Sequence, residues 1–153
     1  MDPARFIDPK NIVPDLQGGG KREVIEELLD RLIATETVSP QHREEILHEL
    51  LERENKGSTA IGFEIAIPHA KTDQVAEIAV ALGLHRAGIP YNTNDGKPVR
   101  ICILTLSSKK ATGPHLQFMA TICNQLKEEK VRKNLLACKT AEQVDALLKK
   151  TAS

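Results

Sequence analysis

Two of the five histidines stand at positions from which a side chain can do chemistry. His69 directly follows a short apolar run and Pro68, so the backbone that carries it is stiff. His115 follows Gly113 and Pro114, where a helix is expected to begin. Such junctions are where rigid scaffolds present functional groups. Two histidine side chains could serve as a nucleophile and as a second group that assists it. It could also bind a metal, although no third ligand is placed by the sequence.

The remaining histidines have simpler interpretations. His42 and His48 lie among charged residues of an expected helix, which indicates solvated surface positions. His85 ends an expected strand and precedes Arg86, which favours solvation at a strand end or loop. Residue types alone leave a structural role for His69 open.

The chemistry of a phosphohistidine defines which neighbours His69 would need. A neutral imidazole nitrogen attacks phosphorus only if its tautomer is fixed by a hydrogen bond to the other ring nitrogen. The phosphoryl group then brings nearly two negative charges, which a guanidinium or a second imidazole must offset. Arg53, near the end of an expected helix, is the natural cation, although its neighbours Glu52 and Glu54 are equally typical of a surface position.

The elements that must position these residues follow from the apolar spacing. Apolar residues at helical spacing predict a helix over 21–33. A second helix is expected after Ser39-Pro40 and ends at Gly57. The segment 61–69 is interpreted as a strand that Pro68 stops, and 78–84 as a further strand.

The second half of the chain is expected to continue with a strand and then helices. Residues 99–106 are apolar at nearly every position, which favours a strand covered on both faces, and Asn94-Asp95-Gly96 before it has turn chemistry. Thr140 and Gln143 form a capping box that begins the last helix. The helix before it is expected to bury one stripe of apolar residues: Leu116, Met119, Ala120, Cys123 and Leu126. Helices that bracket strands predict a sheet with helices packed on its faces.

Length and composition limit the class of protein. The 153 residues suit one compact domain, and the formal net charge of zero lacks the basic excess of a nucleic-acid binder. The first residues lack a signal-peptide core, and no long uncharged apolar run follows, so we expect a soluble cytoplasmic protein without membrane insertion. The three cysteines, Cys102, Cys123 and Cys138, lack metal-ligand spacing and are expected to be small buried apolar residues.

The stretch from Arg53 to Ala70 resembles the phosphorylation-site motif of a known family. The family is the EIIA proteins of the phosphoenolpyruvate-dependent sugar phosphotransferase system, mannitol/fructose class, which includes the nitrogen-related regulatory EIIA. Residues at nine positions that the motif restricts have its spacing: Glu54, Ile61, Gly62, Ile65, Ala66, Ile67, Pro68, His69 and Ala70.

The resemblance implies a fold and a set of site residues. Residues 1–153 would form a single EIIA type-2 domain of the α/β class, with a mixed sheet of about five strands flanked by helices on both faces. By similarity, His69 would be phosphorylated through Nε2, His115 would stabilise the phosphoryl group, and Arg53 would neutralise its charge. Ser58 and Thr59 would line the site. No cofactor and no metal are implied.

The resemblance also implies an activity and partners. The chain would be a phosphotransferase component that accepts a phosphoryl group from phospho-HPr on His69 and passes it to an EIIB protein or domain for sugar uptake. The alternative is a regulatory EIIA of the nitrogen type, which controls partner proteins according to its phosphorylation state. A metal-dependent hydrolase that uses His69 and His115 is a weaker third hypothesis.

Two departures from the family pattern affect these expectations. Glu64 stands where many relatives have Gly, and we expect it to add a carboxylate near a site that must hold a dianion. Tyr91-Asn92-Thr93-Asn94 replaces a more usual acidic-apolar connection, and we expect it to alter a partner surface.

Overall fold

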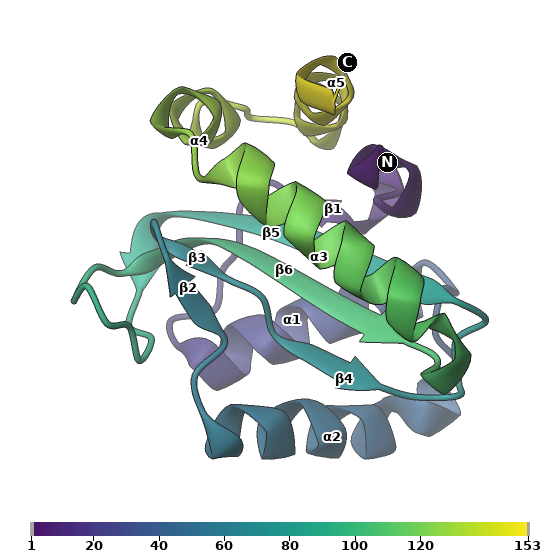
Figure 1. Cartoon of the computed structure of the whole chain (residues 1–153). Helices are drawn as coiled ribbons and strands as arrows, with labels where there is room; N and C mark the ends of the chain where they lie inside the picture. Colours follow the sequence, from purple (N-terminus) through teal and green to yellow (C-terminus); the bar gives the residue numbers. More distant parts are fainter. Residues whose placement is uncertain (1, 153) are drawn as a thin grey trace.

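A six-stranded mixed sheet forms the centre of the computed structural model, which describes residues 2–152 (Figure 1). Two long antiparallel strands, β5 (Ile78–Ile89) and β6 (Val99–Ser107), make up its middle. The short strand β1 (Ile12–Val13) is parallel to β5 at one edge. On the other side, β3 (Ile65–Ala66) and β4 (His69–Lys71) run parallel to successive parts of β6. This pairing places His69 opposite Thr105.

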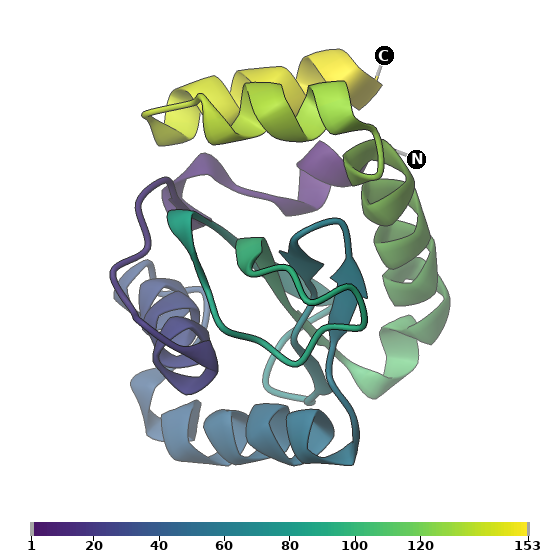
Figure 2. The ribbon, with the colours of Figure 1, turned by 90° about the vertical axis from the view of Figure 1, so that its left-hand side faces the viewer.

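Helices cover both faces of the sheet, as expected for the α/β class (Figures 1 and 2). On one face lie α1 (Lys21–Ala34) and α2 (Arg43–Lys56). The opposite face is covered by α3 (Thr112–Leu126). Two further helices, α4 (Glu129–Leu136) and α5 (Ala141–Ala152), pack against each other, and α5 also packs on the N-terminal segment. Short 3₁₀ helices span Pro3–Phe6, Pro9–Asn11, Pro40–His42 and Lys109–Ala111.

Alternation along β6 divides the core in two. Cys102, Leu104 and Leu106 pack with the apolar residues of α1 and α2. Ile101 and Ile103 belong to the core beneath α3, α4 and α5. Because both faces of β6 are covered, nearly every residue of the strand is buried, which confirms the interpretation of this run.

Several expected elements are confirmed. The helix expected over 21–33 is α1, and α2 follows Ser39-Pro40 through a 3₁₀ turn, although the Ser39 side chain makes no capping hydrogen bond. The capping box is present, since the Gln143 amide donates to Thr140 Oγ1 at 3.1 Å and the Thr140 amide donates back to Gln143 Oε1 at 3.3 Å. The sequence interpretation omitted β1 and α4.

The prediction of a single strand over 61–69 is wrong. The segment forms β2 (Ala60–Gly62), which pairs antiparallel with β3 through a tight turn, and then β4. Phe63 and Glu64 in the turn have φ angles of 57° and 65°, a region that favours glycine. The period of the apolar residues could not reveal this reversal, because the turn lacks the usual turn residues. His69 therefore begins β4, and Ile67 and Pro68 separate it from the end of β3.

Two other expectations need correction. The strand expected over 78–84 continues to Ile89, and His85 lies within it, half-buried, with Nε2 within 3.0 Å of the Gly18 carbonyl oxygen. The expected stripe on α3 is wrong in part: Leu116 is 62% exposed and Ala120 is exposed, whereas Leu126 is buried and Met119 and Cys123 pack against the core. The residues of α3 that are buried are His115, Phe118, Ile122 and Leu126. Since α3 is apolar around much of its circumference, helical spacing fits both stripes and does not select one.

The expectation that the cysteines are buried apolar residues is confirmed for two of the three. Cys102 and Cys138 are buried, Cys123 is half-buried, and all three are free thiols. Within residues 2–152, the helices are too short or too polar to cross a lipid bilayer.

Candidate functional site

The ring of His69 is held by its own chain. Nδ1 lies 2.8 Å from the carbonyl oxygen of Ile67, two residues earlier. A carbonyl oxygen can only accept, so Nδ1 carries the proton and donates it. In the neutral ring Nε2 therefore has a free lone pair, and the half-buried side chain leaves it accessible. This is the state that a nucleophilic imidazole requires.

His115 brings a second ring next to the first. It lies in the first turn of α3 and is only 6% exposed, and the two ring centroids are 5.8 Å apart with planes inclined at 49°. Burial, followed by the nearby His69 and Lys71, lowers the pKa of His115 below its ordinary value of 6.5. The ring is therefore neutral near neutral pH. Its Nδ1 is buried and has no hydrogen-bond partner within the described part of the chain.

Arg53 and Lys71 add two cations on the solvent side of His69. Arg53, in the last turn of α2, donates through Nη1 to the Gly57 carbonyl oxygen at 2.6 Å. Together with His69 and Lys71 it lines a cavity of about 240 Å³. Lys71 Nζ also donates to Thr112 Oγ1 at 3.1 Å, which links β4 to the start of α3. We call Arg53, His69, Lys71 and His115 the His69 site.

Sequence reasoning missed Lys71, although a signal was available. Residues two apart in a strand point to the same side of a sheet, so His69 and Lys71 share one side of β4 while Ala70 is buried on the other. A lysine at this spacing from a candidate phosphorylated histidine is a candidate for charge compensation.

The structure places Arg53 and His115 each beside His69, but it places Ser58 and Thr59 elsewhere. Both lie in the connection between α2 and β2, outside the residues that line the cavity. Ser58 Oγ accepts a hydrogen bond from the Ala60 amide at 3.1 Å. Thr59 is 4% exposed, and its hydroxyl contacts the carboxylate of Glu54 and the hydroxyl of Tyr91.

The expected effect of Glu64 on the site is wrong. Its carboxylate pairs with the guanidinium of Arg100, and its carbonyl oxygen accepts the Arg100 amide at 2.8 Å. The neighbouring Ile65 pairs with Ile101 of β6, whereas His69 pairs with Thr105. Four residues of strand separate these positions, or about 13 Å. Glu64 therefore adds no charge beside His69.

Tyr91 is not a surface residue, contrary to the expectation for the 91–94 connection. Its side chain is only 9% exposed, and its hydroxyl donates to Glu54 Oε1 at 2.7 Å. Burial is the main cause that raises the pKa of the Tyr91 hydroxyl far above its ordinary value, so the group stays protonated and remains a donor. Tyr91 therefore changes the interior, while Asn92 and Asn94 of the same connection are exposed, and their effect on a partner surface stays a prediction.

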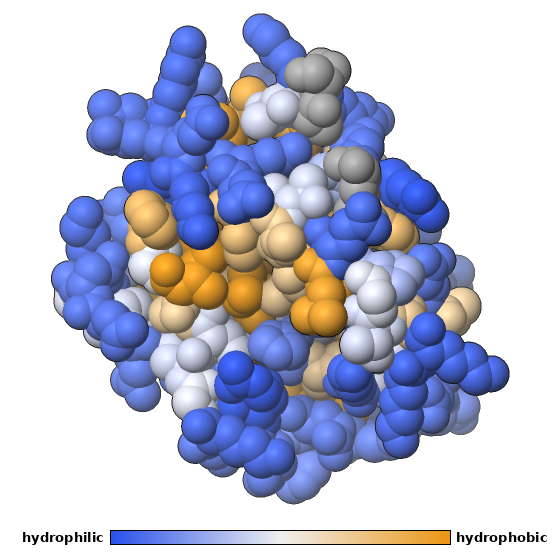
Figure 3. Space-filling model, viewed as in Figure 1, coloured by the Kyte–Doolittle hydropathy of each residue, from blue (hydrophilic) through white to orange (hydrophobic). Residues whose placement is uncertain are grey.

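The surface near the two histidines is partly apolar. Leu116, next to His115 on α3, is a large apolar side chain that is exposed; the other one in the described part of the chain, Phe63, lies in the β2–β3 turn, away from His69. Figure 3 shows an apolar area on the face that carries α3, surrounded by hydrophilic side chains. Exposed apolar surface bordered by polar residues is typical of a protein interaction site.

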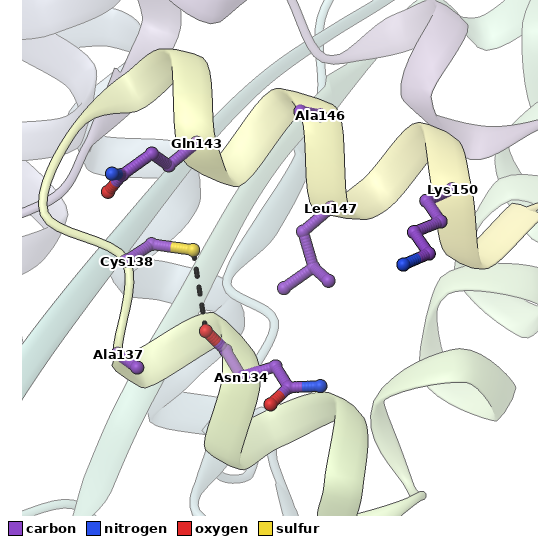
Figure 4. Close-up of a pocket in the computed structure, with 7 residues that line it drawn as sticks. All are labelled: Asn134, Ala137, Cys138, Gln143, Ala146, Leu147 and Lys150. Atoms are coloured by element: carbon purple, nitrogen blue, oxygen red, sulfur yellow. Dashed lines mark hydrogen bonds between the residues drawn. The ribbon is translucent and has the colours of Figure 1, made fainter.

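A separate groove of about 420 Å³ lies between α4 and α5 (Figure 4). Its lining includes Cys138, whose Sγ donates to the Asn134 carbonyl oxygen at 3.4 Å. Burial raises the pKa of the Cys138 thiol, so the thiolate that a nucleophile needs is disfavoured. This groove lacks the paired titratable groups of the His69 site. Within residues 2–152, no three His, Cys, Asp or Glu side chains are grouped to hold a metal ion.

Comparison with known proteins identifies the family. Residues 5–151 match the family model of the phosphoenolpyruvate-dependent sugar phosphotransferase system, EIIA 2. The chain is 35% identical over 128 residues to a fructose-specific EIIA component from Haloferax volcanii, which covers 84% of this chain and 82% of the relative. It is 30% identical over 143 residues to a nitrogen regulatory protein from Bradyrhizobium diazoefficiens, covering 94% and 92%. The chain belongs to the EIIA type-2 family, whose members are phosphotransferase components.

Solved structures agree on the fold. The crystal structure of the nitrogen regulatory protein IIA-Ntr from Neisseria meningitidis superposes with a TM-score of 0.85 at 28% identity, covering 95% of this chain and 97% of that one. The mannitol enzyme IIA of Escherichia coli, in complex with its phosphorylated enzyme IIB, superposes with a TM-score of 0.75 at 24% identity, covering 91% and 94%. The similarity to the mannitol enzyme IIA, at 24% identity, shows a shared fold and nothing more.

Proposed function

We propose that this chain carries a phosphoryl group on Nε2 of His69, accepting it from phospho-HPr and passing it to an EIIB protein or domain that serves sugar uptake. The observation that supports this most directly is the 2.8 Å contact between His69 Nδ1 and the Ile67 carbonyl oxygen, because it leaves Nε2 as the free nucleophile. Family membership supplies the reaction class.

The transfer is a substitution at phosphorus. The Nε2 lone pair forms the new P–N bond while the bond from phosphorus to the donor breaks, and the donor's leaving nitrogen keeps that electron pair. The ring becomes cationic as it is phosphorylated, and the Ile67 carbonyl oxygen accepts from the Nδ1–H throughout. Passing the group to the next acceptor reverses these changes.

The other residues of the His69 site stabilise the phosphoryl oxygens. Arg53 and Lys71 border the cavity in front of His69 and supply positive charge. His115 is neutral, and as an uncharged ring it donates one hydrogen bond without the cost of burying a charge. Charge stabilisation by preorganised donors is the main contribution to phosphoryl transfer in proteins.

Leu116 supplies part of the surface on which the donor and acceptor proteins dock. It is 62% exposed and follows His115 directly, so it lies beside the reacting group. We expect Leu116→Ser to raise the KM for phospho-HPr about fivefold and to leave kcat nearly unchanged. The reason is that the lost contact contributes equally to binding in the ground state and in the transition state. Steady-state transfer kinetics measure both constants. A fall in kcat with unchanged KM would contradict the docking role.

Phosphorylation can be tested directly. The chain is incubated with phosphoenolpyruvate, enzyme I and HPr, and intact-mass spectrometry follows the addition of one acid-labile phosphate. We expect the wild type to be modified and His69→Ala to remain unmodified, with His48→Ala as the control, because His48 is an exposed histidine on α2. Equal modification of His69→Ala would overturn the proposal.

A regulatory role is the second candidate, in which the phosphorylated and unphosphorylated forms bind different target proteins. The 30% identity to the nitrogen regulatory protein of Bradyrhizobium diazoefficiens and the TM-score of 0.85 with that of Neisseria meningitidis favour it. Pull-down from cell extract with the phosphorylated and unphosphorylated forms separates the two roles. Recovery of the same partners by both forms would reject the switch, and sugar-dependent transfer to an EIIB partner would support transport.

A further inference from the structure

We infer that Glu54 is a positioning residue for His69, and that it acts through Thr59 and Ile67. The inference deepens the proposed function, because it concerns how the phosphorylated ring is oriented. The evidence is a series of hydrogen bonds, joined through the backbone of Thr59 and Ile67, that begins at a buried carboxylate and ends at the imidazole.

The series begins with a carboxylate inside the protein. Glu54 lies in the last turn of α2, yet it is only 7% exposed. The negative end of a helix dipole disfavours a carboxylate at this position, and burial adds a desolvation cost. Its place in the fold therefore depends on the donors around it.

Donors satisfy both oxygens of Glu54. Oε1 accepts from the Tyr91 hydroxyl at 2.7 Å and from the Thr59 hydroxyl. Oε2 accepts from the Thr59 amide at 3.3 Å, and Lys21 Nζ lies 3.3 Å from the same oxygen. Lys21 also lies over the Tyr91 ring, 4.5 Å from its centroid. We call Glu54, Thr59, Tyr91 and Lys21 the Glu54 cluster.

Three elements meet at this cluster. Lys21 begins α1, Glu54 lies in the last turn of α2, and Tyr91 belongs to the connection between β5 and β6. Figure 1 shows the start of α1 and the end of α2 at the same end of the molecule. Thr59 is therefore fixed to the scaffold by both its amide and its side chain.

Thr59 transmits this fixed position to the histidine. Its carbonyl oxygen accepts the amide of Ile67 at 3.0 Å. The Ile67 carbonyl oxygen in turn accepts His69 Nδ1–H at 2.8 Å. The same peptide segment thus connects the buried carboxylate to the atom that fixes the His69 tautomer. If Thr59 shifts, the Ile67 carbonyl loses its alignment with the ring.

The variant Glu54→Gln tests this series with almost no change in volume. An amide group replaces one oxygen and turns an acceptor into a donor that faces other donors, so one of the two hydrogen bonds that Thr59 donates to this side chain is lost. The matched control is Glu64→Gln. Glu64 is half-buried in the β2–β3 turn and is ion-paired with Arg100, and within residues 2–152 none of its hydrogen bonds leads to His69.

The primary readout is the ¹⁵N NMR spectrum of the His69 imidazole in the unphosphorylated protein. We expect the wild type and Glu64→Gln to show Nδ1 protonated and Nε2 unprotonated. In Glu54→Gln we expect a substantial fraction of the other tautomer and a phosphorylation rate about tenfold lower. An unchanged imidazole spectrum in Glu54→Gln would overturn the inference.

Thr59→Val provides the second variant, and it decides the question if Glu54→Gln does not fold. It removes the hydroxyl, keeps the shape and leaves the Thr59 amide bonded to Glu54. We expect a smaller tautomer shift in the same direction, and no shift would reject the series. The spectrum is recorded without a phosphoryl donor, so failure of the positioning role is distinguishable from failure of the proposed function.

Discussion

Arg53 and Glu54 are neighbours in the last turn of α2, yet they belong to two regions with opposite properties. Arg53 borders an open cavity with a half-buried histidine and a second cation. Glu54 belongs to a closed cluster in which the carboxylate, Thr59 and Tyr91 are all less than 10% exposed. Successive residues of a helix point about 100° apart, which is enough to separate solvent from the interior here.

The difference between the two regions lies in how far their polar groups are satisfied. In the Glu54 cluster, both carboxylate oxygens have donors and a lysine balances the charge. In the His69 site, the cavity is lined by Arg53, Lys56 and Lys71 together with Glu49 and Glu52, and Nε2 of the His69 ring is left free. A closed, neutralised cluster contributes to stability and orientation, while an open cationic site is arranged for an incoming anion. Stability should therefore respond mainly to substitutions in the Glu54 cluster, and the phosphorylation rate should respond most strongly to substitutions in the His69 site.

The largest expected effect on stability is that of Glu54→Ala. Removing the carboxylate leaves Lys21 unpaired and the Tyr91 and Thr59 hydroxyls short of an acceptor, which costs about 3 kcal/mol of the free energy of unfolding. Urea unfolding followed by circular dichroism measures the change. His69→Ala, which removes the reactive ring, is expected to cost less than about 1 kcal/mol. Equal losses in the two variants would show that the regions do not differ in this way.

The reverse pattern is expected for Arg53→Ala. The guanidinium stabilises charge at phosphorus, so its loss slows phosphorylation of His69 about a hundredfold. Stability falls by less than about 1 kcal/mol, because the contact with the Gly57 carbonyl is on the exposed side of α2. Arg22→Ala is the control, since Arg22 is an exposed arginine paired with Glu26 on α1. A similar slowing in the control would point to a general charge effect.

A smaller effect is expected for Tyr91→Phe. The variant removes one donor from Glu54 while Thr59 and Lys21 stay in place, which costs about 1 kcal/mol. Phosphorylation should stay within about twofold of the wild type, because the connection from Thr59 to Ile67 is intact. Urea unfolding and phosphoryl-transfer assays on the same sample measure the change in stability and the change in phosphorylation rate. A large loss of activity without a loss of stability would place Tyr91 in the His69 site.

The smallest expected effect is a dependence of stability on pH from His115. Its pKa in the folded state lies below its ordinary value of 6.5, so the unfolded chain takes up the proton first as the pH falls. The stabilisation is complete above pH 6.5 and is lost as the pH decreases through and below that value. Urea unfolding between about pH 7 and about pH 5 should show a steeper fall for the wild type than for His115→Asn. Parallel curves would contradict the lowered pKa.

The sequence by itself determined those helices and strands whose residue pattern fits only one local structure. Ile25, Leu28 and Leu32 have a single helical period, and α1 forms where they predict it. The buried run of β6 and the capping box of α5 are local features with local causes. The motif around His69 also indicated the family, which the match over residues 5–151 confirmed.

Tertiary structure decided the features that depend on contacts between distant residues. Helical spacing fits both sides of α3, and only packing against the sheet buries Phe118 and leaves Leu116 exposed. The carboxylate of Glu64 points away from His69 because it pairs with Arg100, which is 36 residues away in the sequence. Lys71 becomes part of the His69 site because β4 pairs with β6 beside the start of α3. Likewise, Glu54 lies inside the protein because Lys21, Thr59 and Tyr91 surround it. Local periodicity cannot specify such partners, since burial and pairing are set by which elements meet in space.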